Sequence, residues 1–156
     1  MRNIKLTIEY DGTNYHGWQI QPNGITIQEV IQNGLTTLTK AETQIVGAGR
    51  TDTGVHAAGQ VANFHTDSRM PPSAFQKGLN SLLPEDIVII DAEDVLPDFH
   101  ARFSTASRTY RYTILNREYP SAFLRSTTYF FPRPINISQA NKICSALVGK
   151  RDFSSF

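Results

Sequence analysis

The stretch GAGRTDTGVHA, residues 47–57, constrains this chain more than any other part of its sequence. Small residues dominate it, so it cannot help build a core by burying large side chains. It is therefore expected to be a loop between packed elements, and its three glycines allow positive φ and let a ligand approach the main chain. Arg50 and Asp52 stand close together in this loop, and a functional site is the simplest reason for that.

Regular elements are predicted on both sides of the loop. Apolar and polar residues alternate over residues 4–10, which predicts a half-buried strand. A capping box followed by an apolar stripe predicts a helix over residues 26–40. A short strand is expected over 60–64, a helix opened by two prolines over 71–83, and a buried strand over 87–90. This β-α-β-α-β order predicts an α+β unit with a mostly antiparallel sheet.

A second unit is expected to begin near Ser107. The sequence predicts a strand over residues 107–115, another over 127–131 and a helix over 138–148. We therefore expect an N-terminal α+β subdomain over residues 1–104, carrying the Asp52 loop. Residues 105–156 are expected to start a second, incomplete α+β subdomain.

Charge is unevenly distributed along a chain whose formal net charge is only +1. Residues 85–98 hold six acids and no Lys or Arg, whereas residues 102–133 hold six arginines and a single acid, Glu118. This asymmetry is typical of a surface directed toward phosphate groups. The alternative is a solvated charged face without a partner.

Cysteine and histidine usage gives no indication of a metal site. Cys144 is the only cysteine, so the chain has no internal disulfide and no cysteine-based zinc site. The histidine spacings match no standard zinc pattern. No apolar run approaches membrane-spanning length, and we expect a cytoplasmic protein that binds neither metal nor membrane.

Four motifs, in the same order along the chain, carry a resemblance to a known family. They are EYDGTNYHGWQIQPN (9–23), GRTDTGVHA (49–57), FHARFSTASRTYRY (99–112) and DFSSF (152–156). The second closely resembles the GRTDAGVHA signature of the TruA family of tRNA pseudouridine synthases, with Thr53 where alanine is common. The resemblance implies the pseudouridine synthase fold, two ferredoxin-like (RRM-like) α+β halves whose mostly antiparallel sheets are flanked by helices, with the active site in the cleft between them.

The resemblance implies that Asp52 is the catalytic nucleophile. Pseudouridine formation breaks the C1′–N1 bond of uridine, turns the uracil and rejoins it through C5. A carboxylate can form a covalent intermediate that holds one fragment meanwhile, by attack on the base or on the sugar. The isomerisation involves no net redox change, so no cofactor is expected. From the residues alone, a loop-capping role for Asp52 is an equal alternative.

Two further residues are expected at the site, Tyr110 from the resemblance and Arg50 from its place beside Asp52. Tyr110 matches the active-site tyrosine of the family. Tyr112, two residues further on, is expected on the same strand face, so spacing alone does not choose between them. The Tyr110 ring is expected to stack on an extruded uracil. Arg50 is expected to bind a phosphate beside the flipped nucleotide, to fill the gap that the base leaves, or to position Asp52 through a salt bridge.

Some roles stay open from the residues alone. Arg102, Arg108 and Arg111 lie near enough in sequence to supply phosphate contacts. His56 is expected either to shuttle a proton or to satisfy the loop backbone. Tyr15 and Trp18 are expected either to contact RNA or to anchor their loop.

Two other functions compete with this interpretation. Asp52-Thr53-Gly54 is also the tripeptide of aspartic proteases, but in those enzymes it follows an apolar strand and two such aspartates share a proton. Arg50 would oppose that sharing. A non-catalytic RNA-binding module would use the aromatic and basic residues near Tyr110 but leave the Asp52 loop without a purpose.

The resemblance also implies a substrate and an assembly. The family acts on uridines 38–40 in the anticodon stem-loop of tRNA, as a homodimer. Its members continue beyond the DFSSF motif into a strand whose basic residue pairs with the catalytic aspartate, and residues 1–156 contain no such segment. We therefore expect residues 1–156 to be a fragment with little or no synthase activity by itself.

Overall fold

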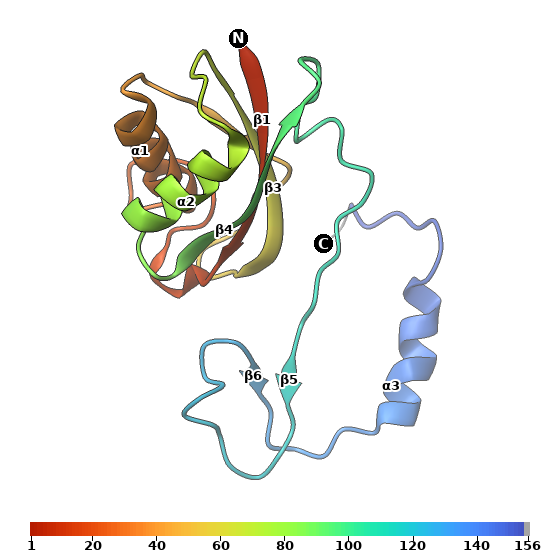
Figure 1. The fold of residues 1–156 in the computed structure, drawn as a ribbon. Helices are drawn as coiled ribbons and strands as arrows, with labels where there is room; N and C mark the ends of the chain where they lie inside the picture. The colour runs from red at the N-terminus through yellow and green to blue at the C-terminus, as the bar shows by residue number, and fades with distance from the viewer. Residues whose placement is uncertain (155–156) are drawn as a thin grey trace. The chain divides into compact units, whose positions relative to one another are not determined.

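The computed structural model describes residues 1–154, and the chain forms two compact units, Met1–Thr109 and Tyr110–Phe156 (Figure 1). The last two residues of the DFSSF motif, Ser155 and Phe156, lie outside the described residues.

The first unit is a four-stranded antiparallel sheet with two helices on one face (Figure 1). Its elements are β1 (Arg2–Tyr10), the 3-10 turn η1 (Gly12–Asn14), α1 (Ile27–Thr39), β2 (Ile45–Gly47), β3 (Ala57–Thr66), α2 (Pro72–Leu82) and β4 (Ile87–Val95). The strand order β2-β3-β1-β4 places β1 and β3 in the centre. The predicted α+β class and antiparallel sheet are confirmed here. The predicted order missed β2, a three-residue strand.

The core lies between the sheet and the helices. Ile4, Leu6 and Ile8 of β1 are fully buried, as their alternation predicted. Phe64 of β3 packs edge-on against Phe75 of α2, with ring centroids 5.3 Å apart. Burying each such side chain contributes about 1.5–3 kcal/mol.

Both predicted helices of this unit are present. The side chain of Thr26 caps α1 by accepting a hydrogen bond from the N–H of Glu29, at 3.4 Å. Lys40 then closes the helix in the left-handed conformation. The second helix begins at Pro72, where a missing N–H costs nothing.

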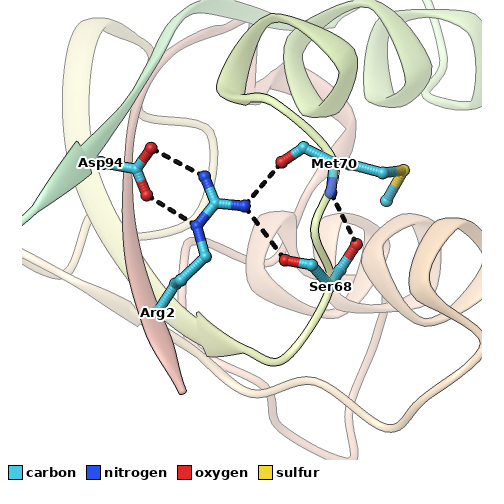
Figure 2. A network of polar contacts seen from close by, with 4 residues as sticks. All are labelled: Arg2, Ser68, Met70 and Asp94. Carbon is cyan, nitrogen blue, oxygen red and sulfur yellow. Dashed lines mark hydrogen bonds and ion pairs between the residues drawn. The ribbon is translucent and has the colours of Figure 1, made fainter.

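Arg2 is the centre of a network of polar contacts in the first unit (Figure 2). The guanidinium of Arg2 binds the carboxylate of Asp94 through two hydrogen bonds, at 2.7 and 2.9 Å. It also donates to the carbonyl oxygens of Ser68 and Met70, just before α2. Arg2 thereby joins β1 to β4 and to the segment that leads into α2.

Two buried asparagines organise the sheet face opposite the helices. The Asn63 amide donates to the Asn3 side-chain oxygen at 2.9 Å and accepts from the N–H of Ala101. Asn3 in turn donates to the carbonyls of Leu96 and Phe99. Because both side chains are almost fully buried, these bonds fix residues 96–101 onto the sheet.

The second unit contains less regular structure than the sequence predicted. It has β5 (Ile114–Leu115), β6 (Tyr129–Phe130), α3 (Ile137–Cys144) and the 3-10 turn η2 (Ser145–Leu147). The expected strand over 107–115 is wrong for residues 107–113, which form no strand. Within residues 1–154 no strand pairs with that segment, and an unpaired strand leaves its backbone groups without partners. The short strands β5 and β6 pair in parallel.

Candidate active site

The Asp52 loop, residues 48–56, connects two neighbouring antiparallel strands, β2 and β3. Its start is fixed by the N–H of Ala48, which donates to the carbonyl of Val61 at 2.7 Å. The side chain of Gln60 then donates to the carbonyl of Gly49. The loop therefore rises from the edge of the sheet on a defined base.

Asp52 and Arg50 line the same hollow, which has a volume of about 600 Å³. One wall consists of residues 50–53, and the other consists of His16 and residues 19–21. Both side chains are exposed to solvent. Within residues 1–154 the Asp52 carboxylate has no hydrogen bond or ion pair, and no salt bridge joins it to Arg50. The two groups thus share a hollow with their charged ends available.

Thr51, directly before Asp52, is held at two atoms. Its carbonyl accepts the backbone N–H of Trp18 at 2.9 Å. Its hydroxyl lies 2.8 Å from the hydroxyl of Tyr10, the last residue of β1. Burial raises the pKa of the Tyr10 phenol, so this group stays protonated at neutral pH.

The positive φ expected at the three glycines of residues 47–57 is found at one of them, and the other two have different roles. Among the three, only Gly54 has a positive φ, at 78°, and its N–H donates to the carbonyl of Tyr15. Gly47 instead leaves space for an indole, because a Cβ there would lie 2.6 Å from the ring of Trp18. Gly49 adjoins the side chain of Arg108, whose guanidinium donates to the carbonyl of Ala48 at 2.5 Å. The main chain is thus close to protein side chains at these two positions.

The loop of residues 11–18 supports the far end of the Asp52 loop. Nδ1 of His56 lies 2.9 Å from the Asp11 carboxylate and 3.2 Å from the N–H of Gly12. Asp11 also accepts from the N–H and the hydroxyl of Thr13, and these bonds, with smaller contributions from His56, lower its pKa. The structure therefore places His56 against the loop backbone, one of its two expected roles.

Tyr15 and Trp18 anchor their loop. Trp18 is 3% exposed, and its ring lies 6.1 Å from that of Tyr10. The hydroxyl of Tyr15 donates to the carboxylate of Asp86 at 2.5 Å. Burial, together with this carboxylate, raises the pKa of Tyr15 well above its ordinary value. The anchoring role is the one that the structure bears out.

Tyr110 belongs to the second unit and is 78% exposed in a segment without regular structure. The expectation that Tyr110 and Tyr112 share one strand face is wrong, because no strand forms there. Tyr112 contacts Tyr129, with ring centroids 6.1 Å apart. Arg108, by contrast, belongs to the first unit and contacts the Asp52 loop directly. Sequence proximity to Tyr110 had suggested only a phosphate contact for it.

Two further features bear on ligands and environment. Over residues 1–154, no three His, Cys, Asp or Glu side chains converge as the ligands of a metal ion would. The helices in that range are all too short or too polar to cross a membrane.

Comparisons with known proteins agree with the sequence motifs. The family model for tRNA pseudouridine synthase matches residues 6–104. Over all 156 residues the chain is 51% identical to tRNA pseudouridine synthase A 2 of Clostridium perfringens and 50% identical to tRNA pseudouridine synthase A of Caldicellulosiruptor saccharolyticus. It is 49% identical to tRNA pseudouridine synthase A of Citrifermentans bemidjiense. All of the chain is matched each time, and it spans 64% of the first two relatives and 62% of the third. Because the family model covers well over half of its residues, the chain belongs to the tRNA pseudouridine synthase family.

Proposed function

We propose that the protein containing residues 1–156 isomerises uridine to pseudouridine in tRNA, with Asp52 as the nucleophile. The observation that carries this proposal is the placement of Asp52 in a family-matched segment. Its carboxylate is exposed in a hollow beside Arg50, while the residue before it is held by Tyr10 and Trp18. A reactive carboxylate needs both this fixed support and this access.

The chemistry balances without a co-reactant. The C1′–N1 bond of the target uridine breaks and a C1′–C5 bond forms, while C5 loses a proton and N1 gains one. Asp52 forms a temporary covalent bond with the base or the sugar and is released unchanged. No oxidant, reductant or water is consumed. The demands on the protein are therefore a placed carboxylate, a route for one proton, and an extruded base held in position.

Arg50 and Tyr110 are the two other residues that we propose contact the substrate. Arg50 is exposed in the same hollow without an ion pair to Asp52, which favours phosphate binding over the positioning role. The Tyr110 ring meets two requirements for stacking on a base, because it is aromatic and accessible to solvent. The strand order β2-β3-β1-β4 supports a ferredoxin-like topology for residues 1–109.

An aspartic protease is the less favoured alternative. Asp52 lies in an irregular loop rather than at the end of an apolar strand, and Arg50 shares its hollow. A neighbouring cation stabilises the ionised carboxylate and so opposes the shared proton that this protease mechanism requires.

The finer proposals concern the target and the assembly. We expect action on uridines 38–40 of the anticodon stem-loop by a cytoplasmic homodimer of two-domain subunits. Incubating the full-length protein with unmodified tRNA transcripts and mapping pseudouridine by position tests the target. Sedimentation of the same protein tests the dimer.

The nucleophile is tested by Asp52→Asn in the full-length protein, which removes the charge with little change in volume. We expect a folded variant that binds tRNA like the wild type but makes no pseudouridine. Asp98→Asn serves as the matched control, because Asp98 is an exposed aspartate that does not line the hollow. Substantial activity in a folded Asp52→Asn variant would show that another group is the nucleophile.

A further inference from the structure

We propose that Tyr10 is a positioning residue for Asp52, acting through the hydroxyl of Thr51. This inference rests on the proposed function of Asp52. Tyr10 is the last residue of β1, is 2% exposed, and places its phenol oxygen 2.8 Å from Oγ1 of Thr51. Thr51 is the residue directly before Asp52, so its orientation sets where the Asp52 side chain begins.

The backbone of Thr51 is fixed independently of that hydroxyl pair. Its carbonyl accepts the N–H of Trp18 at 2.9 Å. Gly17 lies against the same oxygen with a φ of +80°, and a Cβ there would lie 2.5 Å from it. The carbonyl is thus held by one residue and closely packed by another. The hydroxyl bond to Tyr10 adds a third constraint, which opposes rotation of this peptide and of the Asp52 side chain that follows.

Tyr10 is well suited to hold the loop because its own position is set by the centre of the sheet. It pairs with Ala57 of β3 on one side and with Ile87 of β4 on the other. Its ring lies 6.1 Å from that of the buried Trp18, which limits motion of the phenol. The hydrogen bond between the Tyr10 and Thr51 hydroxyls therefore holds the residue before Asp52 against the sheet.

The test uses Tyr10→Phe and Thr51→Val in the full-length protein, since each removes one hydroxyl and keeps the side-chain shape. We expect the single-turnover rate at saturating tRNA to fall by roughly 10- to 100-fold in each variant, as a misplaced reacting group predicts. The dissociation constant for tRNA should stay at its wild-type value. Thr51→Ser, which keeps the hydroxyl, should retain most of the rate.

Two further variants separate positioning from a general loss of stability. Thr43→Val removes another buried threonine hydroxyl, one that bonds to the carbonyl of Ala41 outside the Asp52 loop. It should lower the unfolding temperature without lowering the rate. The double variant Tyr10→Phe/Thr51→Val should be no slower than the slower single variant, because both changes break the same bond.

Four results would overturn the proposal: a wild-type rate in folded Thr51→Val, a wild-type rate in folded Tyr10→Phe, equal losses in Thr51→Ser and Thr51→Val, or rate losses that multiply in the double variant. If Tyr10→Phe does not fold, the Thr51→Ser and Thr51→Val pair decides alone. Failure of the proposed function is distinguishable, because it would show as full activity in Asp52→Asn. Loss of the positioning role alone leaves Asp52→Asn inactive and Tyr10→Phe at the wild-type rate.

Discussion

The carboxylate of Asp11 lies 2.9 Å from Nδ1 of His56, and this pair joins the loop of residues 11–18 to the Asp52 loop. Asp11 follows the last residue of β1, and His56 precedes the first residue of β3. A Cβ on the intervening Gly12 would collide with the backbone carbonyl of Val55, so the two loops are in close backbone contact here. The pair therefore fixes the far end of the segment that carries Asp52.

The first prediction concerns the pH dependence of stability. Hydrogen bonds from Thr13 and, to a smaller extent, His56 lower the pKa of Asp11 below its ordinary value of 3.8. A carboxylate with a lowered pKa in the folded state contributes stability above its unfolded pKa and loses it as the pH falls through the folded value. Asp11→Asn should thus be less stable than the wild type at neutral pH, and the difference should shrink below about pH 4.

The magnitude is small, because both side chains of the pair are partly exposed and solvent screens them. We expect a loss below about 1 kcal/mol at neutral pH. Urea unfolding of both proteins at several pH values between 3 and 7 measures it. Asp98→Asn controls for the charge change by itself. A difference between wild type and Asp11→Asn that grows as the pH falls would contradict the assignment.

The sequence predicts the first unit well because its local and tertiary preferences agree. Alternation at Ile4, Leu6 and Ile8 predicted a half-buried strand, and these side chains form the core of the sheet. The Thr26 cap predicted the start of α1. Agreement between local pattern and global packing is what makes such elements predictable.

The missed features depend on contacts that a linear pattern does not contain. Gly47 is a residue type common in loops, but it lies in β2, where the absence of a Cβ leaves room for the Trp18 ring. Arg108 supports the Asp52 loop through a single carbonyl, a contact between residues 60 positions apart. The segment around Tyr110 has strand-like composition, yet a strand forms only where a neighbouring strand pairs with it. The sequence motifs nevertheless indicated Asp52 and Arg50, which share one hollow.

The second prediction distinguishes stacking from proton transfer at Tyr110. Tyr110→Phe keeps the aromatic face and Tyr110→Ala removes it. If Tyr110 stacks on the extruded uracil, the phenylalanine variant should keep its tRNA affinity and the alanine variant should lose about 1–3 kcal/mol of it. Equilibrium binding to tRNA and single-turnover rates measure both effects. A slow phenylalanine variant with normal affinity would instead indicate proton transfer by the phenol.

Tyr112→Ala is the matched control for Tyr110→Ala. Tyr112 is 76% exposed, close to the value for Tyr110, and its ring contacts Tyr129. Its loss should leave tRNA affinity near that of the wild type. Equal losses at Tyr110 and Tyr112 would mean that the segment acts through its overall shape rather than through one stacking ring.

The last prediction concerns how tRNA binding depends on salt. Arg50 is exposed in the Asp52 hollow, and arginines recur from Arg102 to Arg133, so phosphate contacts should supply much of the affinity. Each neutralised phosphate releases counterions, which makes the logarithm of the binding constant fall steeply with the logarithm of salt concentration. Arg50→Gln should therefore weaken binding and flatten this slope by about 0.7–0.9, the value for one contact. Lys77→Gln, which removes an exposed cation from α2 instead, should leave the slope unchanged.

A binding constant that stays flat between low and moderate salt would exclude Arg50 and the arginines from 102 to 133 as the main phosphate contacts. A normal slope in Arg50→Gln would exclude Arg50 alone and direct attention to the arginines from 102 to 133.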